Sequence, residues 1–60
     1  MKKFTIRYLS TKGVWYVITV KANDYLEACK KIDKKRSVVC FDDWVEGNLE
    51  EYQKVYGTYK

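Results

Sequence analysis

The chain carries few side chains that could perform covalent chemistry. Among its 60 residues are 2 cysteines, Cys29 and Cys40, and no histidine. Nucleophilic catalysis requires a thiol or hydroxyl with a general base beside it, and no imidazole is present to activate either thiol. Cys29 falls on the apolar face of a predicted helix and Cys40 in a predicted strand. We therefore expect both to be small core residues, and function to survive their replacement.

Three carboxylates lie close together in the second half of the chain, at Asp42, Asp43 and Glu46. They could act in acid–base catalysis or hold Mg²⁺ or Ca²⁺ weakly, but their spacing matches no known calcium loop. An acidic turn after a strand is more often a solvated loop. The chain also has too few preferred ligands for tetrahedral zinc and no glycine-rich phosphate loop. The sequence therefore predicts a protein that is not an enzyme, with no catalytic residue, metal or cofactor.

The most informative stretch comprises residues 14–20, which are all β-branched or aromatic. This composition favours a β-strand, in which side chains alternate between two faces. One face carries Val14, Tyr16, Ile18 and Val20, and the other carries Trp15, Val17 and Thr19. Both faces need cover, and the functional question is what covers the face of Trp15.

A hairpin should position this strand. Residues 4–9 alternate in the same way, and the polar turn at residues 10–13 ends in glycine, as hairpin connections often do. The more apolar faces of the two strands should align. The first strand contributes Phe4, Ile6 and Tyr8 to that shared face.

A helix is predicted from Asp24 to about Lys35. Asp24 can accept hydrogen bonds from the free amides of the first turn, and Glu27 completes a capping-box-like pair. The apolar face of this helix is formed by Tyr25, Ala28, Cys29 and Ile32, with Leu26 at its margin. The lysines of the helix fall elsewhere, and such a face is usually solvated.

Two further elements follow. Residues 37–41 form a third strand that reaches about Trp44, and the pattern is broken at Asp42-Asp43 and at Glu46-Gly47. Asn48 then begins a short helix that ends before Gly57. Its apolar stripe is Leu49, Tyr52, Val55 and Tyr56. A second hairpin strand is the alternative for this last element, because Tyr and Val also suit strands.

These elements predict one small α+β domain spanning residues 1–60, with the order β-β-α-β-α. Its core is a small three-stranded, mainly antiparallel sheet, with the first helix packed on one face and a short C-terminal helix. A right-handed crossover makes the third strand parallel to the second, and it can pair beside the first strand, in the order 2-1-3. We expect Ile6, Ile18, Cys29 and Ile32 to be buried together.

Size and charge limit the choice of partners. A chain of 60 residues buries only about 60% of its unfolded surface, so oligomerisation, most simply as a dimer, would help to stabilise it. The formal net charge of +4 mildly favours anionic partners. No signal peptide and no apolar run of about 20 residues is visible. The sequence therefore indicates a cytoplasmic protein without membrane contact.

The C-terminal helix could cover the face of Trp15 within one chain, in which case a partner binds elsewhere. Two binding hypotheses use this face instead. In the first, a partner protein or a second copy contacts Arg7, Trp15, Val17, Tyr52, Val55 and Tyr56. In the second, Trp15 stacks on a nucleic-acid base while basic neighbours hold phosphates, the contact set being Lys3, Arg7, Trp15 and Lys21. A third hypothesis, an antitoxin-like regulator, combines both.

Three resemblances bear on function. The hexapeptide at residues 12–17 loosely resembles the strand motif of RNA-recognition domains, although Val14 and Trp15 depart from it. The first half of the chain is similar to HicB-type antitoxins at residues 16–17 and 26–28, but it lacks their proline-glycine segment. As a chain of 60 residues rich in lysine, tyrosine and aspartate, it resembles small bacteriophage accessory proteins. This resemblance implies a viral protein with an anti-defence or host-takeover role that blocks a host enzyme or defence complex. We favour a non-enzymatic protein that acts by protein–protein contact, with nucleic-acid binding as the alternative.

Overall fold

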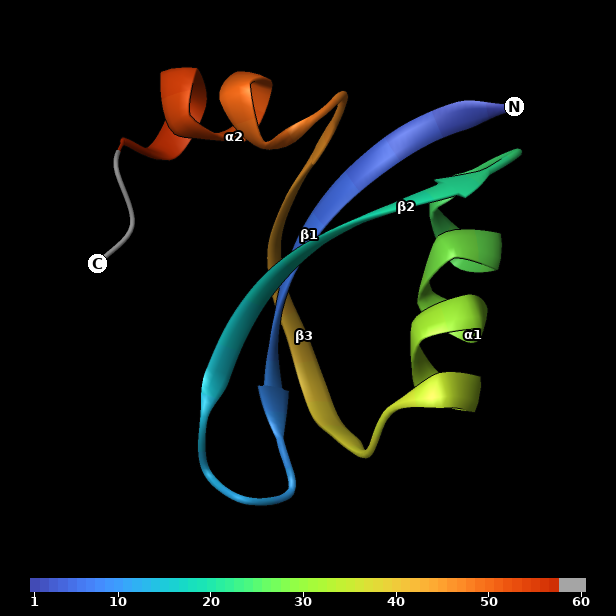
Figure 1. Cartoon of the computed structure of the whole chain (residues 1–60), viewed down its shortest axis with the longest axis vertical. Helices are drawn as coiled ribbons and strands as arrows, with labels where there is room; N and C mark the ends of the chain where they lie inside the picture. Colours follow the sequence, from blue (N-terminus) through green and yellow to red (C-terminus); the bar gives the residue numbers. More distant parts are fainter. Residues whose placement is uncertain (58–60) are drawn as a thin grey trace.

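The computed structural model describes residues 1–57 and contains one three-stranded sheet and two helices (Figure 1). The elements in chain order are β1 (Lys2–Ser10), β2 (Trp15–Ala22), α1 (Tyr25–Lys35), β3 (Val38–Glu46) and α2 (Leu49–Tyr56). The sheet order is β2-β1-β3, and β1 is antiparallel to both neighbours. The predicted α+β fold is confirmed, and the last element is the helix rather than the alternative strand.

The hairpin aligns the apolar faces of its two strands as predicted. Ile6 pairs with Ile18, and Tyr8 pairs with Tyr16, so these side chains lie on the same face of the sheet. The turn is closed by a hydrogen bond from the Ser10 amide to the Val14 carbonyl at 2.8 Å. Gly13 has φ +80°, a backbone conformation that a side chain would disfavour. The second strand begins at Trp15, one residue later than predicted, because Val14 belongs to the turn.

Helix α1 is capped as the sequence predicts. The Asp24 carboxylate accepts from the Glu27 amide at 2.8 Å, and the Glu27 carboxylate accepts in return from the Asn23 side chain at 3.2 Å. The helix ends at Lys35, and Arg36 caps it by donating from its amide to the Ile32 carbonyl. These contacts satisfy backbone groups at both helix ends that have no partner within the helix itself.

The core lies between α1 and one face of the sheet. Its buried members are Phe4, Ile6, Tyr8, Ala22, Ala28 and Ile32. Ile18 and Cys29 pack against this cluster but are only partly buried, so the predicted core group is confirmed in position and is less enclosed than expected. Cys40 is exposed, and its expected core location is wrong because its side chain lies on the other face of the sheet.

Strand β3 runs through the acidic residues Asp42 and Asp43 and extends two residues beyond its predicted end near Trp44. It continues to Glu46, and the register shifts between the pairs Ile6–Trp44 and Tyr8–Phe41. Arg7 therefore faces two residues of β3, Asp42 and Asp43, instead of one, which is the pattern of a β-bulge. The bulge absorbs the extra residue and lets the strand continue.

Helix α2 lies on the face of the sheet opposite α1 (Figure 1). Asn48 caps it by accepting from the Glu51 amide at 3.2 Å. Tyr52 is its one buried residue. On the same face of the sheet Thr5 is fully buried, and its hydroxyl contacts the Thr19 hydroxyl at 2.8 Å and donates to the Gly47 carbonyl at 2.9 Å. The short helix thus covers one end of this face and leaves the hairpin end open.

Candidate functional site

The open end of the sheet face opposite α1 is built from two rows of paired residues. In one row Val17 lies opposite Arg7, and in the next Trp15, Leu9 and Cys40 lie side by side across three strands. Trp15, Val17 and Leu9 are half-buried. We call this surface, together with the exposed side chains Val55 and Tyr56 of α2 on the same side of the sheet, the Trp15 face.

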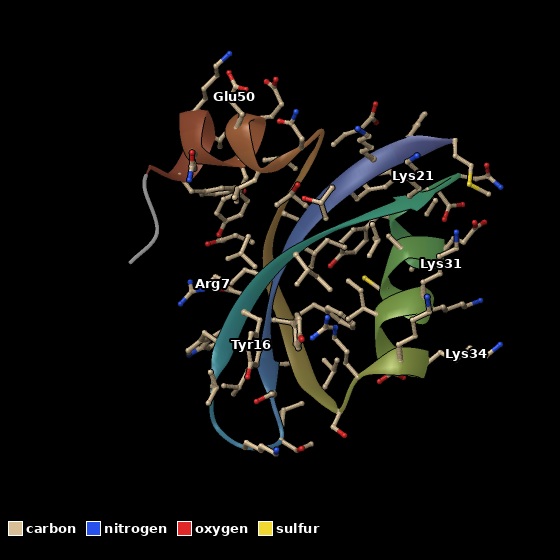
Figure 2. All side chains as sticks on the ribbon, in the orientation of Figure 1. Arg7, Tyr16, Lys21, Lys31, Lys34 and Glu50 are labelled. Carbon is tan, nitrogen blue, oxygen red and sulfur yellow. The ribbon has the colours of Figure 1, made fainter. Side chains whose placement is uncertain are left out.

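Arg7 is the centre of the Trp15 face. Its guanidinium carbon lies 4.3 Å from the centre of the Trp15 ring, within the range of a cation–π interaction. Figure 2 shows Arg7 pointing away from the sheet on the side opposite Lys31 and Lys34 of α1. The pairing of β1 with β2 explains the contact, because Arg7 and Trp15 lie on the same face in adjacent rows of the hairpin.

The bulge in β3 supplies the counter-charges. Arg7 Nη1 donates to Asp42 Oδ2 at 2.8 Å and lies 3.7 Å from Asp43 Oδ2. A regular strand would alternate the two aspartates between faces, whereas the bulge brings both near one guanidinium. The positive charge of Arg7 is therefore matched within the chain, and its contacts with Asp42 and Asp43 hold the guanidinium group over the Trp15 ring.

Tyr52 is the residue by which α2 packs against this side of the sheet. Its side chain is buried, its ring centre lies 4.9 Å from that of Tyr56, and Tyr56 donates from its hydroxyl to the Trp44 carbonyl at 3.4 Å. Burial raises the pKa of the Tyr52 hydroxyl, and the negative charge of Asp43 raises it further. Of the three α2 residues assigned to the interface from sequence, Tyr52 is thus interior, whereas Val55 and Tyr56 are exposed.

The residues proposed for nucleic-acid contact share this face but do not form one binding group. Lys3 and Lys21 pair with each other at the end of the two strands that lies farthest from the hairpin turn, and both are exposed. Arg7 lies two rows away, where the carboxylates of the bulge already hold it and one side of the Trp15 ring is covered. The arrangement favours protein contact over base stacking at this face.

The acidic trio predicted from sequence is divided between two places. Asp42 and Asp43 contact Arg7, whereas Glu46 lies 3.8 Å from the ammonium group of Lys2 in an exposed ion pair. Across residues 1–57 no three His, Cys, Asp or Glu side chains come together in a way that could hold a metal ion. The three carboxylates of β3 therefore form ion pairs with Lys2 and Arg7.

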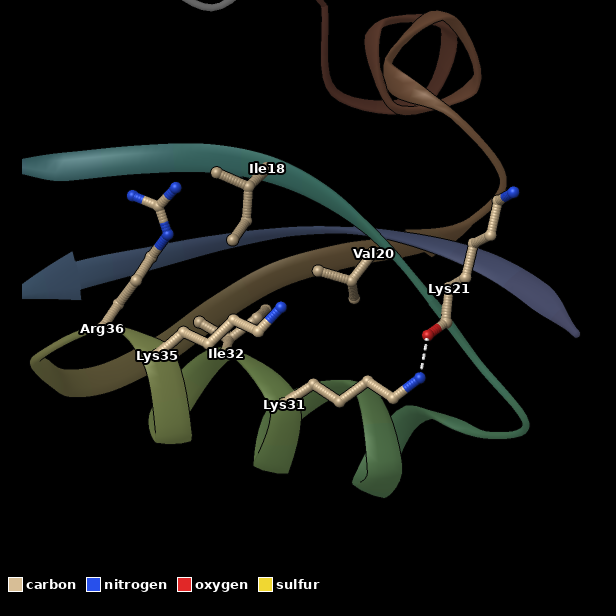
Figure 3. Close-up of a pocket in the computed structure, with 7 residues that line it drawn as sticks. All are labelled: Ile18, Val20, Lys21, Lys31, Ile32, Lys35 and Arg36. Atoms are coloured by element: carbon tan, nitrogen blue, oxygen red, sulfur yellow. Dashed lines mark hydrogen bonds between the residues drawn. The ribbon is translucent and has the colours of Figure 1, made fainter.

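A second surface was not anticipated from the sequence. A groove of about 350 Å³ runs between β2 and α1 (Figure 3). Its lining residues are Ile18, Val20, Lys21, Lys31, Ile32, Lys35 and Arg36. The available signal was the spacing of Lys31 and Lys35 beside Ile32 on α1, which also fits a plain solvated helix face. A smaller hollow of about 240 Å³ adjoins it and shares Arg36.

Comparison of the chain with protein-family models, curated protein sequences and solved structures gives no match. In the part of the chain that the structure describes, neither helix has the length and apolar character needed to cross a membrane. The functional argument therefore depends on the geometry of the Trp15 face and of the groove.

Proposed function

We propose that the protein is a non-enzymatic binding protein that acts by protein–protein contact, as a dimer joined through the Trp15 face. The observation that carries this proposal is the half-buried Trp15 ring, held by Arg7 on an end of the sheet that α2 leaves open. A tryptophan side chain has roughly 150–250 Å² of surface to bury, so further burial of this ring against a second copy is favourable.

The composition of the face supports protein contact. Tryptophan, tyrosine and arginine dominate the energetics of protein interfaces. Arg7 lies over Trp15, and the exposed Tyr56 of α2 lies on the same side of the sheet. Because Asp42 and Asp43 match the charge of Arg7, the face can be desolvated without leaving an isolated positive charge. The contacts also hold Arg7 in place before binding, which lowers the entropic cost of association.

The size and shape of the molecule also fit. A stable interface buries about 800 Å² on each partner, which is roughly a fifth of the 4278 Å² surface of this chain. The Cα positions span 28 × 27 × 12 Å, so the broad faces offer much of the surface. The core has few fully buried side chains, and dimer formation would add the apolar burial that so small a domain lacks.

The resemblance in length and composition to small bacteriophage accessory proteins suggests the kind of partner. On this view the dimer acts in the cytoplasm of a bacterial host and blocks a host enzyme or defence complex by binding to it. Cys29 and Cys40 are both free thiols, which fits a reducing compartment. An antitoxin-like role would add nucleic-acid contact, for which the Trp15 face provides less support because Arg7 is already paired.

The mass in solution, measured by light scattering, tests the dimer. We expect the wild-type protein to be dimeric and Trp15→Glu to be monomeric. Asp42 and Asp43 already match the charge of Arg7, so a third carboxylate would bury an unmatched negative charge in the interface. Leu26→Glu is the matched control, since Leu26 is 69% exposed on α1, away from this face.

A second variant separates loss of association from loss of folding. Val55 is 64% exposed at the edge of the Trp15 face, so Val55→Glu should weaken the dimer while leaving the circular dichroism spectrum unchanged. A monomeric wild-type protein, or a folded Trp15→Glu variant that remains dimeric, would contradict the proposed interface.

A further inference from the structure

We infer that the groove between β2 and α1 binds an acidic, extended segment of a partner protein, which adds to the sheet as a fourth strand beside β2. This inference rests on the proposed function and names the partner chemistry that it leaves open. The groove lies on the α1 side of the sheet, so the Trp15 face can join two copies while each groove stays accessible.

The outer edge of β2 is available for pairing. Within residues 1–57, β2 has β1 as its one neighbour in the sheet. The Val14 carbonyl accepts from Ser10 of β1, whereas the Lys21 carbonyl accepts from Lys31 of α1 at 2.6 Å. Backbone groups alternate in direction along a strand. Val17 and Thr19 lie four and two residues before Lys21, so their amides and carbonyls point outward from the sheet, as the Lys21 carbonyl does. An unpaired strand edge of this kind is a template for an added strand.

The groove beside this edge has an apolar floor and a basic rim. Ile18, Val20 and Ile32 form the floor, and no carboxylate is among the lining residues. Lys31 and Lys35 extend from α1 along the groove, and Arg36 lies at its far end (Figure 3). Lys21 lines the groove through its carbonyl group, and its side chain points away from Lys31 in Figure 3.

The charges of the rim are only partly matched by the chain itself. Lys31 lies 3.7 Å from Glu27, but no ion pair involving Lys35 or Arg36 is found among residues 1–57. The Arg36 guanidinium has a long contact of 3.4 Å with the Tyr8 hydroxyl. Carboxylates on a segment lying in the groove would supply the missing counter-charges, and this complementarity specifies an acidic partner.

An extended peptide fits this site better than a single-stranded nucleic acid. Nucleic acids bind such grooves by stacking bases on aromatic rings, whereas the floor of this groove is aliphatic. Two rings, Tyr8 and Tyr16, line the adjoining hollow, and they already stack on each other with their centres 5.5 Å apart. A peptide strand can use the outward amides of β2 and place every second side chain over the floor.

The inference is tested with a fluorescent peptide of alternating threonine and glutamate, equal in length to β2, which has 8 residues. Fluorescence anisotropy should show binding to the wild-type protein, and the same peptide with glutamine in place of glutamate should bind at least about tenfold more weakly. The measurement is repeated on Trp15→Glu. Peptide binding by that monomer supports the groove even if the dimer proposal fails.

Two double variants of α1 provide the matched comparison. Lys35→Glu with Arg36→Glu should reduce peptide affinity by at least about tenfold, whereas Lys30→Glu with Lys34→Glu should change it by less than about twofold. Both pairs make the same change in net charge, but Lys30 and Lys34 do not line the groove. Equal losses in the two double variants would show non-specific charge attraction and overturn the proposal.

Backbone pairing has its own readout. On peptide binding, the amides of Val17 and Thr19 should exchange with deuterium more slowly, because they become donors to the added strand. Unchanged exchange at both amides would overturn strand addition. An oligothymidine probe that binds more tightly than the peptide, and that loses affinity in the Lys35 and Arg36 variant, would instead assign the groove to nucleic acid.

Discussion

The guanidinium group of Arg7 lies over the ring of Trp15 at 4.3 Å and is held there by Asp42 at 2.8 Å. The aspartate follows Arg7 by 35 residues and reaches it because of the bulge in β3. This relationship decides the character of the Trp15 face. It converts an aromatic side chain beside a free positive charge, which would suit a nucleic acid, into an ordered surface with matched charges.

Replacing Arg7 by lysine should disturb this surface although the charge is conserved. Lysine lacks the planar group that stacks on the ring, so Arg7→Lys should lower the free energy of unfolding by about 0.5–1 kcal/mol. The ring should also become more accessible to acrylamide, as measured by Trp15 fluorescence in a Trp44→Phe background. Lys2→Ala is the control, because the exposed pair of Lys2 with Glu46 should contribute little. Equal quenching in Arg7→Lys and the parent would argue against the stacked arrangement.

Substitutions in the core should follow burial. Ile6 is fully buried, whereas Ile18 is partly buried. We therefore expect Ile6→Ala to cost about 2–5 kcal/mol and Ile18→Ala to cost less. Urea denaturation measures both, and Ile6→Val, at about 0.5–1.5 kcal/mol, keeps the series interpretable if the alanine variant unfolds. Leu26→Ala should be close to neutral, and a cost as large as that of Ile6→Ala would mean that α1 packs differently.

Helix α2 should be held mainly by one side chain. Tyr52 is buried and Val55 is exposed, so Tyr52→Ala should cost about 3–5 kcal/mol and Val55→Ala less than about 0.5 kcal/mol. Faster hydrogen exchange across α2 in Tyr52→Ala, with protection of β1 retained, would locate the loss in this helix. Similar costs for the two variants would place the buried stripe of α2 elsewhere.

Stability should fall at alkaline pH through Tyr25. Burial, and next its contact with the Cys29 side chain, raise the pKa of Tyr25 from 10.0 to about 12. In that interval the folded state keeps a proton that the unfolded state has lost, so the free energy of unfolding decreases as pH rises. The stabilisation is complete below pH 10 and is lost towards pH 12. Urea denaturation across this range should show a shallower decrease for Tyr25→Phe than for wild type, whereas Tyr16→Phe, at a more exposed tyrosine, should follow wild type.

The two thiols should differ in reactivity, and the difference should report on the dimer. Cys40 is exposed and lies in the same row as Trp15, whereas Cys29 is partly buried. Alkylation at Cys40 should be faster than at Cys29, and faster in Trp15→Glu than in wild type, because the proposed interface covers it. A variant with Cys29→Ala and Cys40→Ser should still form dimers and bind the acidic peptide. Loss of both properties in a folded variant would indicate a function for the thiols.

Much of the local structure follows from the sequence, because its signals act within one element or between chain neighbours. The alternation of residues 14–20 sets the two faces of β2, and the short turn before it sets the register with β1. Asp24 and Asn48 act as helix caps through amides three residues ahead of them. The antiparallel sheet with β1 in the centre follows from these elements and the right-handed crossover.

The functional surfaces depend on contacts between elements that are distant in sequence, and only the tertiary structure decides them. The sequence places Asp42 and Asp43 in a solvated acidic turn, but in the structure pairing with β1 makes them the two residues of a bulge beside Arg7. Tyr52 and Val55 belong to one predicted stripe, yet an eight-residue helix set against one end of the sheet buries only the first. The groove exists because α1 crosses beside the edge of β2 and brings its basic residues there. Periodicity assigns a residue to a face, whereas packing between elements determines what that face meets.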